Sequence, residues 1–431
     1  MTPASTPARL RIDPALIIVL AGVCAALHVG KLPPAITALQ QALGMSLLQA
    51  GFMLSLVQVA GMSVGVLFGI VADGLGLRRS VVCGLLVLAL ASALGGWARE
   101  VPMLMVLRAF EGFGFLLVAL PAPGLIRQLV APQRLSVMLG LWSAYMPFAT
   151  ALALLVGPIL IVAAGWQAWW WGLAAVSLWM AFCVARAVPR PRDEKLMPAA
   201  ARVPARGAAS APGTGAGASA TRAPALWPAR LRLTLRVPGI WRVAMMFALY
   251  AGQWLAVIGF LPVIAAQAGW SGAALGGLTA LAAGVNIVGN LATGRFLQRG
   301  IRPGAMLIVG FMVMALAAIA AFAGAPQTGL APHWRYAAVL VFSMLGGFIP
   351  ATLFALAVQL APNPQTLATT VGWVQQGSAF GQFVIPPIVA WAASRAGGWQ
   401  WTWWVTCACS ALGLMLAARF ARAPRTSPAA P

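Results

Sequence analysis

The chain has 431 residues, of which 61% are hydrophobic and only 8% are charged. A soluble domain carries about 25% charged residues, so this composition excludes a soluble protein with an ordinary surface. The net charge of +22 does not indicate a nucleic-acid partner, because the basic residues are spread over the termini, alternate loops and one linker rather than gathered on one folded domain.

Long apolar runs follow one another along the whole chain and predict an all-α membrane protein with twelve transmembrane helices. Each run is long enough to cross a hydrocarbon core of about 30 Å as a helix. The basic residues of alternate loops predict a multi-pass protein of the plasma membrane, the inner membrane in a bacterium, with both termini in the cytoplasm. The expected spans are residues 15–38, 47–71, 80–98, 102–129, 136–163, 167–187, 239–266, 272–294, 304–324, 334–360, 366–394 and 399–420.

The junction between the second and third expected spans, Gly69–Ser80, reads GIVADGLGLRRS. Gly69 lets two helices approach closely, and Gly76 allows a tight turn. Asp73 can pair with a following arginine or occupy a helix N-terminus, where the helix dipole favours an anion. A generic cytoplasmic hairpin also explains the basic residues, since these commonly end a span.

This junction resembles the loop between the second and third helices of the major facilitator superfamily, whose pattern there is Gly-x-Leu-Ala-Asp-Arg-x-Gly-Arg-Lys. The residues that match it are Gly69, Ala72, Asp73, Gly76 and Arg78. Gly74 and Leu77 stand where the family has basic residues, so the local charge network is thinner. The resemblance implies a conformational-gate motif made of Gly69, Asp73, Gly76, Arg78 and Arg79.

The chain is expected to consist of two six-helix bundles, residues 1–187 and 239–431, joined by a linker. Landmarks recur between the halves: Gly165-Trp166-Gln167 returns as Gly398-Trp399-Gln400. The linker, residues 188–238, is rich in Ala, Pro, Gly and Arg, and this composition predicts a flexible cytoplasmic segment. Its end, Leu226–Val237, alternates Leu with Arg, which fits either a segment on an anionic membrane surface or a plain linker.

The twelve spans, the duplication and the loop motif together resemble the major facilitator superfamily over nearly the whole chain. The resemblance implies two pseudo-symmetric bundles around a central site near the membrane midplane, and transport by alternating access. It also implies that the first, fourth, seventh and tenth helices line the central cavity.

Arg108 lies inside the fourth expected span, three residues before Glu111. The segment resembles a family motif of the form Arg-x-x-Gln-Gly-x-Gly, with Glu111 in place of Gln. Two interpretations remain open. The two side chains share a helix face and can neutralise each other structurally, or Arg108 binds an anionic substrate or takes part in proton coupling, with Glu111 as the titrating group. Glu111 is the one acid that we place inside a span.

Lys31 lies in the outer half of the first expected span, close to His28 and before Pro33 and Pro34. If Lys31 and Arg108 lie at a similar depth, they form a basic receptor for a small organic anion. The alternative is that Lys31 extends to the outer membrane interface. We expect no functional role for His28, and we interpret the two prolines as a kink.

Small residues of the fifth span, from Gly140 to Pro158, resemble a degenerate form of the family's antiporter motif. They support exchange against protons weakly, because small residues also permit close helix packing. Within the same span, Met138–Ala144 reads MLGLWSA and resembles the family branch that contains cyanate and nitroimidazole transporters.

Polar and aromatic residues of the second half are expected to complete the cavity. The candidates are Gln253, Trp254, Asn286 and Gln376. Amides at such positions hydrogen-bond a substrate or hold helices together. The tryptophan clusters at residues 166–171 and 399–404 are typical of an interfacial belt.

The sequence therefore predicts a secondary active, proton-coupled transporter of a small solute, with a small organic anion as the favoured class. The alternatives are a multidrug-type proton antiporter and a membrane receptor or scaffold that has lost transport. The expected partners are the lipid bilayer, the solute and protons, and we expect a monomer. Neither an enzyme site nor a cofactor is expected: there is no Walker-type phosphate loop, and the five cysteines lack metal-ligand spacing.

Overall fold

The computed structural model describes residues 13–63, 76–189, 227–324, 330–363 and 366–421. All regular secondary structure within these ranges is helical, and nine helical segments there are long and apolar enough to cross a membrane. The all-α prediction is confirmed.

In the first half, residues 59–63 are helical, and the structure also describes the bounds of eight α-helices and one short 3-10 helix. They are α1 (Pro14–Gly30), η1 (Pro33–Ala35), α2 (Ile36–Leu43), α3 (Leu47–Leu56), α5 (Leu77–Gly95), α6 (Val101–Ala119), α7 (Ala122–Leu129), α8 (Pro132–Ser143) and α9 (Tyr145–Ala187). The fifth expected span corresponds to α8 and the first part of α9, and the sixth corresponds to the rest of α9. Within α9, Gly165 has a φ of 84°, and this left-handed residue separates the two spans.

The second half contains eight α-helices and a 3-10 helix whose bounds the structure describes. They are α10 (Trp227–Leu235), α11 (Pro238–Gln267), α12 (Gly272–Gln298), α13 (Pro303–Phe322), α14 (Pro332–Gly346), α15 (Phe348–Leu360), α16 (Leu367–Ala396), η5 (Trp399–Trp401) and α17 (Thr402–Ala421). Within the expected linker, the described residues Trp227–Leu235 form the short helix α10.

Local sequence explains where several helices begin. Ser46 caps α3 in a capping box: its hydroxyl accepts from the Gln49 amide, and the Gln49 side chain accepts from the Ser46 amide. Asp13 caps α1 through a bond from the Ala15 amide. Proline occupies one of the first two positions of several other helices, where its missing N–H is no loss.

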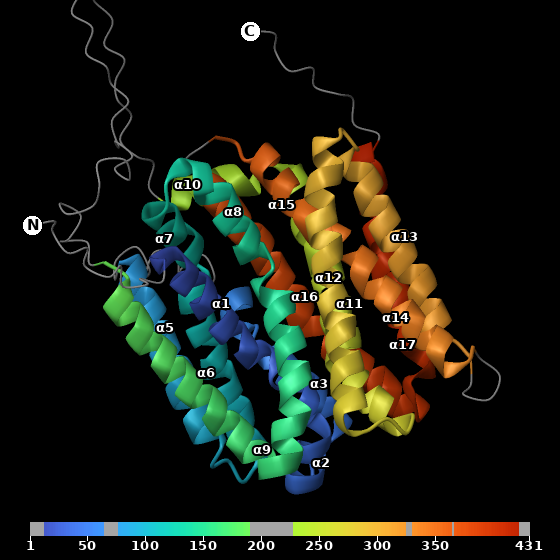
Figure 1. Cartoon of the computed structure of the whole chain (residues 1–431). Helices are drawn as coiled ribbons and strands as arrows, with labels where there is room; N and C mark the ends of the chain where they lie inside the picture. The colour runs from blue at the N-terminus through green and yellow to red at the C-terminus, as the bar shows by residue number, and fades with distance from the viewer. Residues whose placement is uncertain (1–12, 64–75, 190–226, 325–329, 364–365, 422–431) are drawn as a thin grey trace, which may run out of the picture.

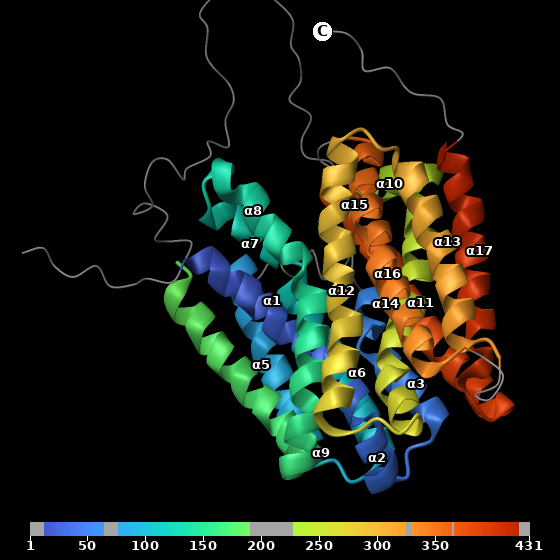
Figure 2. The same cartoon turned by 45° about the vertical axis from the view of Figure 1, so that its right-hand side comes forward.

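The helices of each half pack mainly on one another. In the first half α1 packs on α9 and α5 packs on α6, while in the second half α11 packs on α16 and α13 packs on α17. The most extensive contacts between the halves join α9 with α12 and α3 with α16. Figures 1 and 2 show α8 and α12 diverging toward the end of the molecule where α10 lies.

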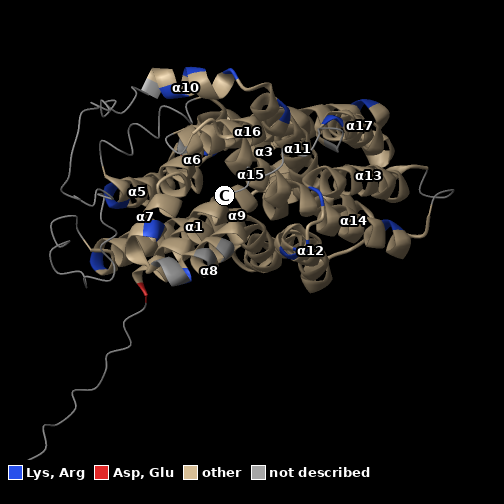
Figure 3. Ribbon diagram, turned by 90° about the horizontal axis from the view of Figure 1, so that it is seen from above, with Lys and Arg blue, Asp and Glu red and all other residues tan. Residues whose placement is uncertain are grey.

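That end of the molecule, which we call the basic end, carries arginines from several helices. Figure 3 views it directly and shows basic residues around its rim, with α10 lying across one side. The basic end is defined by Arg78, Arg127, Arg134, Arg230 and Arg295. The opposite end carries α2 and the turn at which α9 reverses its direction.

The tightest helix contacts depend on glycine. A Cβ atom on Gly381 of α16 would lie 1.9 Å from the Ala248 carbonyl oxygen of α11, and one on Gly112 of α6 would lie 2.3 Å from the Val57 carbonyl oxygen. Real Cβ atoms do not approach backbone atoms so closely. Glycine at these positions therefore allows pairs of membrane helices to pack at close range.

We predict that Gly381→Ala lowers stability by about 1–3 kcal/mol, because the added methyl group forces α11 and α16 apart. The matched control is Gly372→Ala in the same helix, where a Cβ would meet nothing within 4 Å. The control should be neutral or stabilising by up to about 1 kcal/mol, as alanine is the better helix former. Thermal unfolding of both variants in detergent tests this, and equal effects would contradict the packing argument.

Candidate functional site

Three polar residues of α1 and its end point into the first half of the protein. Cys24, His28 and Lys31 are spaced by four and three residues, so they lie on one face of the helix. All three are buried, and the Lys31 and His28 side chains have no exposed surface. The face carries two titratable groups into a low-dielectric interior, where each needs a partner.

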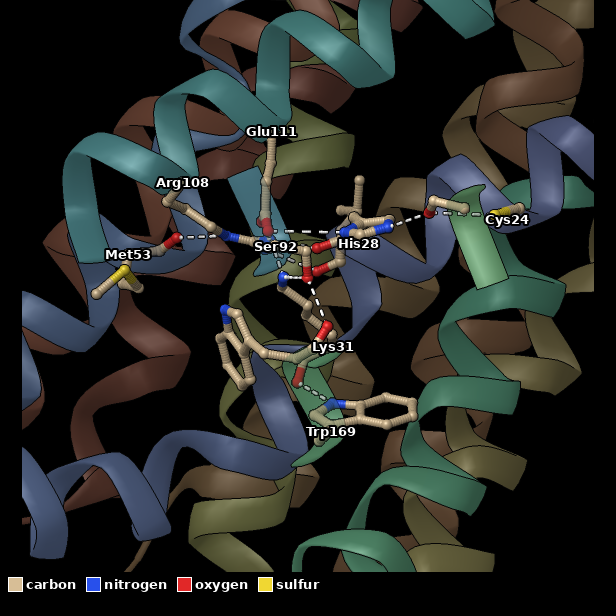
Figure 4. A network of polar contacts seen from close by, with 11 residues as sticks. Cys24, His28, Lys31, Met53, Ser92, Arg108, Glu111 and Trp169 are labelled. Carbon is tan, nitrogen blue, oxygen red and sulfur yellow. Dashed lines mark hydrogen bonds and ion pairs between the residues drawn. The ribbon is translucent and has the colours of Figure 1, made fainter. Parts of the chain in front are cut away.

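The partner of Lys31 is Glu111 of α6. The Lys31 ammonium donates to Oε1 of Glu111, while Arg108 donates from Nη1 to Oε2 of the same carboxylate over 2.8 Å. Arg108 and Glu111 are 2% and 1% exposed, so the pairs are shielded from solvent. Figure 4 shows the three side chains converging from α1 and α6. One buried carboxylate therefore serves two cations.

Arg108 also ties together the backbones of two other helices. Its guanidinium donates to the carbonyl oxygens of His28 and Val29 in α1, the latter over 3.0 Å, and to that of Met53 in α3 over 3.3 Å. A guanidinium has five N–H donors in a planar fork, which allows it to hold one carboxylate and several carbonyls together. Arg108 thus fixes α1 and α3 against α6.

Two tryptophans of α9 close the site around Lys31. The Lys31 ammonium lies 4.5 Å from the ring centroid of Trp170, and the Trp169 indole donates to the Lys31 carbonyl oxygen over 3.0 Å. Ser92 of α5 accepts from Lys31 over 2.9 Å and donates to the Trp170 carbonyl oxygen over 2.8 Å. The cation is held by a carboxylate, a hydroxyl and an aromatic face at once.

His28 extends the network away from Glu111. Its Nε2 shares a hydrogen bond of 2.7 Å with the Ser177 hydroxyl of α9, which in turn lies 3.4 Å from the Cys24 sulfur. Its Nδ1 lies 3.6 Å from Oε1 of Glu111 and has no hydrogen-bond partner within the described part of the chain. The imidazole therefore stands between the carboxylate and a hydroxyl, with one nitrogen unsatisfied.

The geometry decides between several interpretations that the sequence left open. Lys31 does not extend to the membrane interface, because its side chain is fully buried and bound to Glu111. Arg108 and Glu111 do pair with each other. The expected interfacial belt at residues 166–171 is wrong for Trp166, Trp169 and Trp170, which are buried.

Sequence reasoning missed five members of the network, namely His28, Ser92, Trp169, Trp170 and Ser177. The spacing of Cys24, His28 and Lys31 on one helix face is a signal that could have indicated a role for His28, for which we expected none. The two serines carry no comparable signal, because small hydroxyl residues are frequent in membrane helices.

The cluster borders directly on the contacts between the halves. η1, which follows Lys31, packs on α11 of the second half. In α3, Met53 accepts from Arg108, while the adjacent Leu54 packs against Gly259 of α11. A movement of Arg108 or Lys31 therefore acts on the same backbone segments that contact the other half.

The candidate residues of the second half form a separate, uncharged network. Asn286 of α12 donates to the Tyr250 hydroxyl over 3.0 Å and to the Ser343 carbonyl oxygen over 2.7 Å. Trp254 of α11 donates to the Ser343 hydroxyl over 3.0 Å. These bonds join α11, α12 and α14, which is the packing role that amides in membrane helices commonly have.

Gln253 and Gln376 lie apart from that network. Gln253 is buried and accepts from Ser410 of α17 over 3.1 Å, while its amide nitrogen has no hydrogen-bond partner among the described residues. Gln376 of α16 donates to the Met62 carbonyl oxygen over 2.6 Å and so bridges the two halves. The seven candidates are therefore not brought into one site.

The conformational-gate motif is described only in part, because Gly69 and Asp73 lie outside the described residues. Gly76 has a φ of 83° and precedes α5, which agrees with the turn expected there. Arg78 donates to the Ala185 carbonyl oxygen near the end of α9, and Arg79 is exposed.

A cavity of about 420 Å³ lies inside the second half, away from the charged cluster. It opens between the ends of α11, α13 and α16 and the beginnings of α12 and α14, and Arg335, Tyr336 and Trp399 are among its lining residues. Trp399 is thus part of a cavity wall rather than of an interfacial belt. Within the described ranges no group of three or more His, Cys, Asp or Glu residues could hold a metal ion.

Residues 18–371 match the family model of the Major Facilitator Superfamily, and the chain belongs to this family. It is accordingly a membrane transporter and not an enzyme. A tetracenomycin C resistance and export protein of Streptomyces glaucescens is 30% identical over 100 residues. That match covers 23% of this chain and 19% of the other protein.

Solved structures of the same fold agree with this assignment. A D-xylose–proton symporter superposes with a TM-score of 0.71 at 14% identity, over 96% of this chain and 98% of that one. A bacterial homologue of the human lysosomal transporter Spinster gives 0.69 at 15% identity, over 97% of each chain. The transporter FucP gives 0.63 at 17% identity, over 96% and 100%.

We predict that Glu111→Gln lowers stability by about 3–5 kcal/mol, because two cations are left buried without a counter-charge. Lys31→Met should lower it clearly less, since one cation and one anion remain. Exposed Glu100 offers a control acid, and Glu100→Gln should change little. Thermal unfolding in detergent ranks the three variants by their loss of stability. A greater loss in Lys31→Met than in Glu111→Gln would contradict the charge balance described above.

Proposed function

We propose that this transporter moves a small organic anion together with protons, by alternating access, and that the buried cluster of Lys31, Arg108 and Glu111 is its charged site. The observation that carries the proposal is the excess of positive charge in that cluster, two cations for one carboxylate. An anion that enters between Lys31 and Arg108 brings the missing negative charge.

Charge balance links the anion to a proton. With both cations and the carboxylate ionised, the triad carries one net positive charge. A bound monovalent anion would bring the net charge to zero, and one added proton would bring it back to one positive charge. Since a charge in a low-dielectric site is stabilised mainly by its neighbours, anion and proton should favour each other's binding. Glu111, released from its cations by the anion, is the acid at which the proton arrives.

The connections of Arg108 explain how binding would reach the rest of the molecule. Arg108 holds the backbones of α1 and α3, and both segments adjoin helices of the second half. An anion that takes over the guanidinium would loosen these backbone bonds. We infer that the released segments allow the halves to rearrange, which is the movement that alternating access requires.

The orientation follows from the arginines of the basic end. Positive loops face the cytoplasm, so we propose that the basic end is cytoplasmic and that the protein lies in the plasma membrane, the inner membrane of a bacterium. The charged cluster would then lie nearer the outer side, because Lys31 directly precedes η1 and α2 at the opposite end.

A multidrug-type proton antiporter is the second candidate, and the match to an export protein favours it. In that case Glu111 would bind either a proton or a cationic solute. The two cations at the carboxylate oppose this reading, because they repel a cation that approaches Glu111. A receptor or scaffold without transport would have little use for a buried ionic cluster, which is costly to keep in a membrane protein.

We predict that a small organic anion stabilises the purified protein against heat and that Arg108→Ala abolishes this effect. A ligand at one hundred times its dissociation constant stabilises by about 2.7 kcal/mol, which a thermal shift measures readily. Two panels are compared, monocarboxylates and other small anions against lipophilic cations, with Arg395→Ala as the control for loss of an exposed cation. Stabilisation by cations alone, kept in Arg108→Ala, would overturn the anion assignment.

A second prediction concerns coupling, and it uses the anion that the thermal screen identifies. In proteoliposomes, Glu111→Gln should retain exchange of labelled anion across the membrane but lose accumulation driven by a pH gradient, by tenfold or more. Exchange requires only the rearrangement, whereas accumulation requires the titrating acid. Loss of both activities in a folded variant, or retention of both, would exclude Glu111 as the proton site.

A further inference from the structure

His28 lies in contact with the charged triad, and the proposed mechanism leaves it without a role. Its imidazole has no exposed surface and lies between Glu111 of α6 and Ser177 of α9. Buried polar atoms in native proteins are nearly always hydrogen-bonded. The free Nδ1 atom of His28 therefore calls for an explanation.

Neither neutral form of the ring satisfies both nitrogens in this arrangement. If Nε2 carries the proton, it donates to Ser177, and the lone pair of Nδ1 faces the Glu111 carboxylate. If Nδ1 carries it, the 3.6 Å to Oε1 is too long for a hydrogen bond. The imidazolium form makes donors of both nitrogens and places an acceptor opposite each of them; it also requires the ring to move closer to Glu111, and its positive charge attracts it there.

Each N–H and O–H hydrogen around an imidazolium at His28 would have an acceptor. Nδ1–H would donate to Oε1 of Glu111, and Nε2–H would donate to Oγ of Ser177. The Ser177 hydroxyl hydrogen then points to the Cys24 sulfur, 3.4 Å away, which is a weak acceptor. Only a small approach of the ring to Glu111 is needed.

The surrounding charges act on a proton at His28 in opposite directions. Lys31 from the same helix and Arg108 from α6 both repel it, while Glu111 attracts it. Ser92, Ser177 and Cys24 are the remaining polar groups of the site, and they are neutral. Neutralising either cation removes a repulsion and leaves the attraction in place.

We propose that His28 is a second proton-binding site of this transporter, in which the proton is shared with Glu111 and is taken up when an anion neutralises Lys31 and Arg108. The step is a simple transfer: Nδ1 takes a proton from a hydronium ion of the solution, which becomes water, and gives the proton back to water when the anion leaves. This inference rests on the proposed function for its trigger, but the proton site itself can be measured without any solute.

The protein contains two histidines, His28 and His333, and this makes the measurement direct. In protein labelled with isotopic nitrogen at histidine, the side-chain NMR signals report the protonation of each ring between about pH 5 and 8. His333 is exposed at the start of α14 and serves as the internal reference. The full chain is used in detergent or lipid nanodiscs.

In Lys31→Gln, the pH at which half of His28 is protonated should rise by about one to three units, the size of a neighbouring-charge effect. In Glu111→Gln it should fall below that of the unaltered protein, since the attraction is lost. The matched control is Arg395→Gln, which removes an exposed cation of α16 and should move neither histidine. Opposite shifts in two variants of one cluster cannot come from general loss of structure.

The proposal is overturned if His28 stays neutral over the whole pH range in Lys31→Gln, or if Lys31→Gln and Arg395→Gln behave alike. Failure here is distinguishable from failure of the proposed function. If no anion stabilises the protein while His28 responds as described, the proton site stands and the anion assignment falls. If an anion stabilises the protein but does not increase the imidazolium signal, the anion assignment stands and the role of His28 falls.

Discussion

The pairing of one buried carboxylate with two buried cations is the interaction on which the first half of this transporter depends. Each of Lys31, Arg108 and Glu111 would be unstable alone in the membrane interior, where a single unpaired charge costs several kcal/mol. Together they hold α1 to α6, and Arg108 adds α3 through a backbone carbonyl. The tryptophans of α9 and the hydroxyl of Ser92 then complete the surroundings of Lys31. The ionic cluster thus holds α1, α3 and α6 in position relative to one another.

The two halves share an architecture but not a chemistry. Residues 195–431 contain no Asp or Glu, so no side-chain carboxylate of the second half can form an ion pair there. Its polar core is a network of amides and hydroxyls around Asn286 and Ser343, which joins helices without any formal charge. Glycines such as Gly381 bring α11 and α16 together instead. This asymmetry is the reason why we propose anion and proton binding in the first half.

The contacts between the halves begin at the cluster itself. η1 follows Lys31 and packs on α11, while the α3 segment that Arg108 holds packs on α11 and α16. No long chain of intermediates is therefore needed to connect binding with rearrangement. His28 lies between both charged partners, because its backbone carbonyl oxygen accepts from Arg108 and its ring faces Glu111.

The sequence by itself determined the class of protein and most helix positions, because hydrophobic runs and short loop motifs are local properties that need no knowledge of packing. It identified Arg108, Glu111 and Lys31 as candidates, since ionisable residues inside apolar runs are conspicuous. It did not determine their arrangement: Lys31 and Glu111 are 80 residues apart in the chain, and pattern alone does not distinguish a lysine that reaches the interface from one that reaches a carboxylate. Only the tertiary structure placed Trp169, Trp170 and Ser177 around α1, and only it separated the second-half amides from the charged site. Burial and pairing depend on which helices become neighbours, and that is decided by the packing of the whole bundle.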